Sequence, residues 1–429
     1  MKLIKGHIIE AAKFGSLNIL ENGYLVLDDS GTILAVYTQD TLPLTYRKLP
    51  VTDYKDRLIL QSFADMHLHA PQYPMIGMAM DKPLLDWLDT YTFPLEANYT
   101  DLSFARKVYA KLAEELIQWG TTRVCMFSSM HTDATIILME ELEKKGITGY
   151  VGKVNMDRNG GAQLEETTEE SMNETLRFLT LSKRFRNLHP IITPRFTPSC
   201  TDKLMHWLGD LSKQQGLYVQ SHLSENLSEI AWVKELHPDC EKYWQTYDKY
   251  GLWKDHTLMA HCIHMDAAEM DSMAAHGVYA VHCPDSNINL QSGICHVKDL
   301  LSKGVSVVLG SDIAAGAEIG MSRVITSAIR SSKILSIESN YALTPLTVAE
   351  AYFLGSSSGH AYFNDKYGFS VGNKLHAIVV DDSDRISFGS DSLKDRFEKA
   401  IYRMSPKEIV CVYANGVLVK DTLKNGESV

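Results

Sequence analysis

The first residues along the chain that are well suited to chemistry are His67 and His69. They belong to the segment Asp-Met-His-Leu-His at residues 65–69, which follows an apolar run. Residues two apart on an extended strand point to the same face, so the two imidazoles are expected to project together. Two converging imidazoles make half of a metal site. Because the chain has 16 histidines, this pair alone is a weak signal, and its meaning depends on where further ligands fall.

The elements that must position these histidines are apolar strands that alternate with helical stretches from residue 58 onward. Such alternation indicates parallel βαβ units, and eight of them indicate a closed (β/α)8 barrel of the TIM type. An open doubly wound sheet is the alternative, but no G-x-G-x-x-G segment follows any strand. The eight predicted strands are residues 58–66, 122–127, 149–154, 191–196, 217–221, 257–261, 278–281 and 305–309.

Helical stretches are predicted between these strands, for instance at residues 104–119 and 266–276. The second begins with a capping-box pattern, Asp266 followed by Glu269, and is expected to stop at Gly277.

Functional groups of such barrels lie at the C-terminal ends of the strands, and several predicted strands end in metal-binding residue types. His222 follows strand five, His261 ends strand six and Asp312 follows strand eight. Imidazole and carboxylate groups at one barrel mouth suit a zinc or ferrous ion. Alone, His222 fits a capping or core histidine, and Glu225, three residues on, fits a solvated helix-start carboxylate. The set as a whole favours a metal site with a carboxylate beside it.

The remaining histidines are expected to be structural or exposed to solvent. His282 ends strand seven, but the Cys-Pro that follows it favours a structural hydrogen bond over metal binding. The others without such placement are His131, His256, His264 and His376.

Composition excludes several classes of function. The 429 residues carry a net charge of −11 and no block of Lys and Arg, which argues against nucleic acid or an anionic membrane as partner. No apolar run approaches the ~18 residues of a membrane span, and the N-terminus lacks the apolar core of a signal peptide. The seven cysteines form no C-x-x-C pair. This pattern predicts reduced thiols in the cytoplasm and excludes the zinc nucleobase deaminase motif H-x-E…P-C-x-x-C.

The two ends of the chain differ from the middle. Short strands and turns in residues 1–57 and 370–429 predict one small β-sandwich domain built from both ends, around a catalytic barrel at 58–369. Residues 71–100 form a long insertion rich in Met, Trp and Tyr. A loop of this length is expected to be a lid or binding loop, or alternatively a subdomain patch or dimer contact.

With these motifs in place, the chain resembles the amidohydrolase superfamily and, within it, the guanine deaminase family. The broad pattern is D-x-H-x-H with His, His and Asp at the later strand ends. The narrower resemblance rests on His69-Ala70-Pro71-Gln72, Lys82-Pro83-Leu84-Leu85-Asp86-Trp87-Leu88, Tyr91-Thr92-Phe93-Pro94, Met156-Asp157-Arg158-Asn159, Pro194-Arg195-Phe196, His222-Leu223-Ser224-Glu225-Asn226 and His282-Cys283-Pro284-Asp285-Ser286-Asn287.

The resemblance implies a site, a cofactor and a substrate. One zinc ion per chain, or ferrous iron in its place, would be held by His67, His69, His222 and Asp312. Protons would be handled by Glu225, His261 and Asp312. Guanine would be held by Gln72, Arg195, Phe196, His222 and Glu225. One ion is expected because strand four ends without the lysine that binuclear members carboxylate. The family also implies a homodimer, and the cysteine pattern places it in the cytoplasm.

The chemistry of the substrate contacts follows from their side chains. The planar fork of Arg195 suits the purine carbonyl. Gln72 can donate and accept, which suits a ring edge with both kinds of group. Phe196, or an aromatic residue from 71–100, is expected to stack on the ring.

Three departures from the family pattern stand out. Residues 62–64 are Ser-Phe-Ala where Pro-Gly is usual, and residues 311–316 are Ser-Asp-Ile-Ala-Ala-Gly where the family tends to have Thr and a second Gly. His376 stands where an aspartate is common. The first two concern loops near the metal and leave substrate preference open. A related hydrolase of another aminopurine, a pterin, a triazine or an adenosine-type compound is therefore an alternative. A metal-free binding protein is disfavoured because every ligand position is filled.

Overall fold

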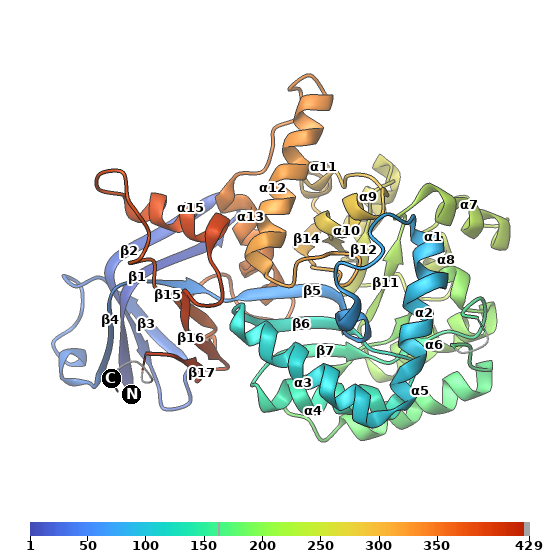
Figure 1. Ribbon diagram of the computed structural model, residues 1–429, viewed down its shortest axis with the longest axis horizontal. Helices are drawn as coiled ribbons and strands as arrows, with labels where there is room; N and C mark the ends of the chain where they lie inside the picture. Colours follow the sequence, from blue (N-terminus) through green and yellow to red (C-terminus); the bar gives the residue numbers. More distant parts are fainter. Residues whose placement is uncertain (162–163, 424–429) are drawn as a thin grey trace.

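The computed structural model describes residues 1–161 and 164–423. One of its sheets is built from both ends of the chain (Figure 1). Its strands are β1 (Lys2–Lys13), β2 (Ser16–Leu27), β3 (Ile33–Tyr37), β4 (Val51–Gln61), β15 (Ala377–Val380), β16 (Ile409–Ala414) and β17 (Val417–Asp421). They lie in the order β17-β16-β15-β4-β1-β2-β3.

The C-terminal tail therefore pairs with the N-terminal strands, as predicted. β15 runs antiparallel to β4, with Ala377 opposite Gln61. In the residues described, these strands form a single sheet, so the second layer of the predicted β-sandwich stays a prediction. Residues 424–429 of the predicted terminal domain lie outside the described residues.

The other strands of the described chain are parallel, which confirms a mixed α/β fold. One sheet has the order β5 (Phe63–His69), β6 (Thr121–Phe127), β7 (Thr148–Gly152) and β9 (Leu188–Pro190). A second has the order β11 (Val219–Leu223), β12 (Thr257–His261), β13 (Tyr279–His282) and β14 (Ser306–Leu309). A short pair joins β8 (Val154–Asn155) and β10 (Thr193–Pro194). A bridge between Ile192 and Val219 and a hydrogen bond of 2.8 Å from Asp312 N to His67 O link the two larger sheets.

Five of the eight predicted strands each correspond to a single observed strand with both ends within two residues, and the other three are interrupted or shortened. The strand expected at 58–66 is two strands, because the chain changes sheet at Ser62, whose hydroxyl lies 2.6 Å from that of Thr122. An apolar run does not reveal which sheet it joins. The strand expected at 149–154 is interrupted at Lys153. Of the one expected at 191–196 only β10, Thr193–Pro194, is formed, and β9 ends just before it at Pro190. Proline has no N–H to donate to a ladder.

A β-bulge in β5 lies just before the histidines. Three steps along β5, from Asp65 to Leu68, oppose two steps along β6. Met66 packs in an apolar cluster formed mainly by strand residues, whereas Leu68 packs in the cluster that includes the surrounding helices. An extra residue reverses the alternation of sides along a strand. The bulge thus places His67 and His69 on the side from which Met66 projects.

Helices follow most of the parallel strands (Figure 1). The predicted helix at 266–276 is confirmed, with reciprocal capping between Asp266 and Glu269 and a left-handed Gly277 at φ 67°. The helices are α1 (Leu84–Trp87), α2 (Phe93–Ala97), α3 (Leu102–Gln118), α4 (Thr132–Lys144), α5 (Thr168–Ser182), α6 (Asp202–Gln215), α7 (Leu227–Leu236), α8 (Gln245–Asp248), α9 (Ala267–His276), α10 (Pro284–Asn289), α11 (Val297–Ser302), α12 (Met321–Glu338), α13 (Val348–Gly355), α14 (Ser357–Ala361) and α15 (Leu393–Arg403).

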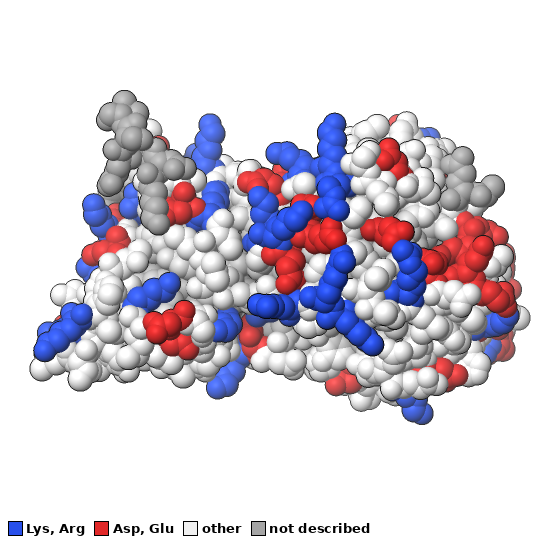
Figure 2. All heavy atoms as spheres, turned by 90° about the horizontal axis from the view of Figure 1, so that it is seen from below, with Lys and Arg blue, Asp and Glu red and all other residues white. Residues whose placement is uncertain are grey.

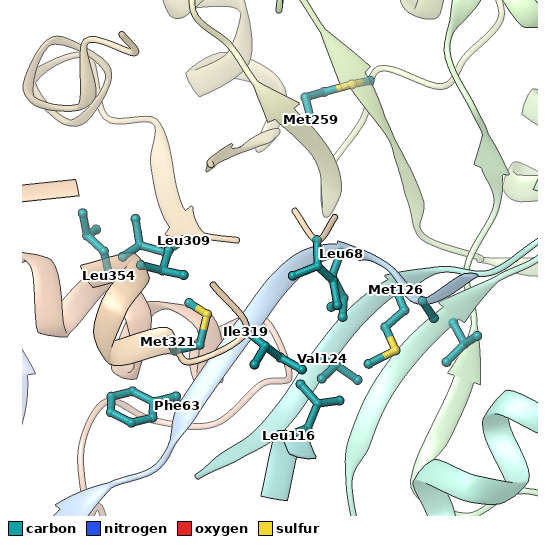
Figure 3. Close-up of a cluster of buried hydrophobic side chains, with 14 of the residues drawn as sticks. Phe63, Leu68, Leu116, Val124, Met126, Met259, Leu309, Ile319, Met321 and Leu354 are labelled. Atoms are coloured by element: carbon teal, nitrogen blue, oxygen red, sulfur yellow. The ribbon is translucent and has the colours of Figure 1, made fainter. Parts of the chain in front are cut away.

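The main apolar core lies between the strands and these helices. Helix α3 presents Leu112 and Leu116 at helical spacing, and both are fully buried. Truncating such a side chain to alanine costs about 2–5 kcal/mol of stability. Figure 3 shows part of this cluster, which includes Phe63, Leu68, Leu116, Val124, Met126, Met259, Leu309, Ile319, Met321 and Leu354.

Charged side chains of both signs are interspersed on the face of the molecule seen from below (Figure 2). Arg106 of α3, for example, pairs with Glu140 and Glu141 of α4. Among the helices described, none combines the length and apolar character that crossing a bilayer requires.

Candidate active site

The predicted metal ligands come together at the C-terminal ends of the parallel strands. The imidazole nitrogens of His69 and His222 lie 3.1 Å apart, and Nε2 of His67 lies 3.2 Å from Asp312 Oδ1. Two groups have ligand atoms mutually within 4.8 Å, namely His67 with His69 and His222, and His67 with His261 and Asp312. All five residues are buried. Such convergence of lone pairs is what a bound cation requires.

Neighbouring groups orient these rings. Nδ1 of His222 lies 2.5 Å from the carbonyl oxygen of Arg195, and Nδ1 of His261 lies 2.9 Å from Oδ1 of Asn287. With a proton on each Nδ1, both rings direct the lone pair of Nε2 into the cluster. Nε2 of His67 and Nδ1 of His69 are buried and find no hydrogen-bond partner in the described part of the chain.

Burial sets the charge state of the cluster. It is the main cause that lowers the pKa of His67, His69 and His222 well below the ordinary value, so the rings are neutral, as metal ligands must be. Burial also raises the pKa of Glu225 to about 8, with the charge of Asp312 adding to the effect. The pKa of Asp312 rises to about 6, again through burial. A bound cation would favour the ionised form of both carboxyls.

Glu225 is placed to exchange protons with this cluster. Its Oε2 lies 3.4 Å from Nε2 of His261, and its Oε1 accepts a hydrogen bond of 3.3 Å from the hydroxyl of Ser292. With a pKa near neutrality, a buried carboxyl can both take up and release a proton at physiological pH.

The backbone is strained where the strands deliver these side chains. His261 and Asp312 have φ values of 75° and 49°, and Ser224 and Cys262 have φ values of 50° and 49°. Residues other than glycine rarely adopt this left-handed region, and such strain concentrates at functional sites.

Asp65 links β5, which carries His67 and His69, to the segment that carries Asp312. Its carboxylate accepts hydrogen bonds from the backbone N–H and the hydroxyl of Ser311, at 2.9 and 2.5 Å. These bonds hold the segment that carries Asp312 against β5. Burial, the largest cause, raises the pKa of Asp65 to about 7.

A pocket with about 430 Å³ of empty space, its open mouth included, adjoins the cluster. The insertion contributes Leu84, Trp87 and Leu88 to its lining, which favours the expected role as a lid or binding loop. Every predicted substrate contact lies in the lining, which consists of His69, Gln72, Leu84, Trp87, Leu88, Arg195, Phe196, His222, Glu225, Glu229, His261, Leu290, Asp312 and Ala315.

One wall of the pocket depends on Glu96, which the sequence did not single out. Its Oε2 lies 2.6 Å from Nη1 of Arg195, and its Oε1 accepts a hydrogen bond of 2.9 Å from Nε2 of Gln72. Oε1 of Gln72 in turn accepts from the backbone N–H of Ala314 at 3.2 Å. Both ends of the Gln72 amide thus already contact protein groups, and the expectation that Gln72 both donates to and accepts from a ligand stays a prediction. The one available signal was an acidic residue inside the apolar segment 93–97.

Glu229 is a second residue that the sequence did not reveal. It accepts hydrogen bonds from the backbone N–H of Glu225 at 3.0 Å and from the hydroxyl of Tyr243 at 2.8 Å. Burial, followed by the charge of Glu225, raises its pKa to about 7. Its position three residues after Asn226 forms a capping box at the start of α7, which is a sequence signal for a helix start rather than for a site.

The ends of strands three and four supply no further candidate ligand. Arg195 follows β10 where a lysine would be needed, and Lys153, which follows β7, donates to Glu166 at 2.8 Å. His282 is buried and contributes no ligand atom to the metal-capable groups found among the described residues. Its structural role stays a prediction. His376 contacts Thr122 at 2.9 Å, as expected of a structural histidine.

The sequence of the whole central region matches a known family. The model of the amidohydrolase family matches residues 58–419. The chain belongs to this family. This amidohydrolase is 36% identical to the guanine deaminase of Dictyostelium discoideum, over 98% of this chain and 98% of that protein. It is 35% identical to the guanine deaminase of Rattus norvegicus, over 96% of this chain and 95% of that protein.

Solved structures agree. The crystal structure of guanine deaminase from C. acetobutylicum, with guanine bound in its active site, superimposes with a TM-score of 0.94 and 41% sequence identity. The match covers 97% of this chain and 99% of that chain. The resemblance seen in the sequence is thereby confirmed, and this amidohydrolase is a hydrolase.

Proposed function

We propose that this amidohydrolase is a guanine deaminase, which hydrolyses guanine to xanthine and ammonia. The observation that carries the proposal is one buried pocket that combines three kinds of group. A metal-capable His and Asp cluster lies at its base, Glu225 lies beside the cluster, and Arg195 and Gln72 line a wall. The guanine deaminases of two other organisms are similar over nearly their full length.

The donor set fits one zinc or ferrous ion, held by His67, His69, His222 and Asp312. Three neutral imidazoles and a carboxylate are the ligands such ions prefer. The buried Nε2 of His67, which has no hydrogen-bond partner among the described residues and lies 3.2 Å from Asp312 Oδ1, supports the assignment. A single ion is expected because Arg195 follows β10 where a second ion would need a lysine. Lys153, which follows β7, is already paired with Glu166. When bound, the ion supplies a water molecule whose pKa is near 7, and so a nucleophile at neutral pH.

The protein's own groups would move the protons. Glu225 takes a proton from the attacking water and delivers it to the ring nitrogen beside C2 of guanine, then assists the departure of the amine as ammonia. Nε2 of His261 lies 3.4 Å from Glu225 and 3.8 Å from Asp312, so it can orient the water between them. The bond from His261 to Asn287 keeps the ring in this orientation.

The pocket walls would hold the purine. Arg195 and Gln72 donate to the acceptors of the ring edge, and Phe196 and Trp87 offer apolar surfaces. His222 and Glu225 complete the contacts near the reacting carbon.

The finer features of the fold and assembly are part of the same proposal. The parallel strands would close into a (β/α)8 barrel at residues 58–369, which the hydrogen bond from Asp312 N to His67 O supports. Residues 1–57 and 370–429 would form the small terminal domain. We further propose a cytoplasmic homodimer that uses neither nucleic acid nor a membrane as partner.

The test is an assay for ammonia with metal-loaded protein and a panel of aminopurines and pterins. Guanine should release ammonia and yield xanthine, while Glu225→Gln, which retains all four proposed ligands, serves as the matched control. Turnover of another panel member with guanine left intact would overturn the proposal.

A further inference from the structure

We propose that Glu96 is a positioning residue of this site, because it fixes Gln72 and Arg195 as hydrogen-bond donors and so makes the wall select rings that offer acceptors. This inference rests on the proposed function, which it deepens. Glu96 lies on α2 within the insertion, 99 residues before Arg195 in the chain. It does not line the pocket itself.

The carboxylate of Glu96 is fully engaged by the two wall residues. One oxygen accepts from Gln72 at 2.9 Å and the other pairs with Arg195 at 2.6 Å. Glu96 is 2% exposed and Arg195 is 3% exposed. A buried charge that loses its partner is strongly destabilised, so each group holds the other in place.

The contacts of Gln72 decide which end of its amide meets a ligand. Glu96 can only accept, so it binds the amide nitrogen, while the amide oxygen accepts one hydrogen bond from the N–H of Ala314. These two bonds fix the orientation of the amide and leave its second N–H for the pocket. Gln72 therefore acts toward a ligand as a donor.

The orientation of Arg195 is fixed in the same way. Glu96 binds one edge of its guanidinium, and the ring of Phe93 lies 5.1 Å from the guanidinium carbon. Phe93 and Glu96 are three residues apart on α2 and so share a face of the helix. Two side chains from one helical turn of the insertion thus contact the guanidinium of Arg195, and its other N–H groups are left for the ligand.

A pocket wall that presents hydrogen-bond donors favours a ligand that presents acceptors to it. Guanine offers a carbonyl oxygen on its six-membered ring, whereas 2,6-diaminopurine carries the same reacting amine at C2 but a donor amine in place of that carbonyl. A site built to pair a polar group rejects a mismatched analogue by roughly 10⁴-fold. The preference should depend on Glu96, although Glu96 touches neither ring.

The experiment compares kcat/KM for guanine and for 2,6-diaminopurine in the metal-loaded wild type and in Glu96→Gln. The amide of glutamine offers an acceptor to only one partner, so guanine kcat/KM should fall about 10²-fold, the range seen for misplaced substrate contacts. The analogue should lose far less, and the preference should drop at least tenfold. An equal fall for both substrates, or no fall, overturns the proposal. If Glu96→Gln does not fold, Glu96→Asp carries the same test, because it keeps the charge but is too short to reach both partners.

A readout without substrate separates this inference from the proposed function. The side-chain amide signal of Gln72 in ¹H–¹⁵N spectra, assigned by its loss in Gln72→Ala, should shift and exchange faster with solvent in Glu96→Gln. An unchanged signal overturns the positioning role. Wild-type enzyme that leaves guanine intact overturns only the proposed function.

Discussion

Replacing Glu225 with glutamine separates its chemical role from its effect on stability. The amide has nearly the same shape as the carboxyl but cannot take up and return a proton. Turnover of guanine should therefore fall by about 10²-fold or more, the usual contribution of a general acid–base group. Metal content should stay unchanged, because the proposed ligands do not include Glu225.

The stability effect follows from the buried position of Glu225. In metal-free protein, burial is the largest cause that raises its pKa from 4.5 to about 8. A group whose pKa is raised by folding contributes stability that is complete below pH 4.5 and is lost as the pH rises toward 8. The difference between these two pKa values corresponds to roughly 5 kcal/mol. Glutamine has no proton to lose, so metal-free Glu225→Gln should become the more stable protein as the pH rises.

The assay is urea unfolding of chelated wild type and of chelated Glu225→Gln between pH 5 and pH 8.5. The other buried carboxyls are common to both proteins, so the difference between the two free energies of unfolding reports Glu225 together with its coupling to Asp312 and Glu229. It should grow with pH in favour of the variant, by several kcal/mol. A difference that is independent of pH would refute the argument from burial. Near-normal turnover of the variant would return Glu225 to a structural role.

Three further predictions concern the ligands of the site. Elemental analysis should find one zinc or iron ion per active chain, and exhaustive chelation should abolish turnover; two ions per chain, or full activity after chelation, would contradict the proposed site. Wild-type enzyme should discriminate against adenine by roughly 10⁴-fold, because its amine would face Arg195 donor to donor. Arg195→Met should lose most guanine turnover with its metal content intact, and should also lose about 3–5 kcal/mol of stability because the buried Glu96 loses its charged partner. Arg195→Lys, which keeps the charge, is the matched control in steady-state kinetics, and guanine kinetics within a few-fold of normal in Arg195→Met would assign Arg195 a structural role.

The residues at the centre of the site were predictable because they follow strands. Alternating apolar and helical segments place His222, His261 and Asp312 at strand ends, and parallel strands bring their C-terminal ends together. The predicted cluster therefore forms although its members are far apart in the chain. This prediction needs no knowledge of side-chain orientation, because the last residues of all parallel strands lie at the same edge of the sheet.

Only the tertiary structure determines in which direction those side chains point and which groups hold them in place. The bulge in β5 that turns His67 and His69 inward exists only as a register against β6. Asp65 meets Ser311 across 246 residues, and Glu96 meets Arg195 across 99. Sequence periodicity reports how a segment repeats along itself, whereas these contacts depend on which distant side chain lies opposite. A buried carboxylate with a partner from another element looks, in the sequence, like any acidic residue on a helix.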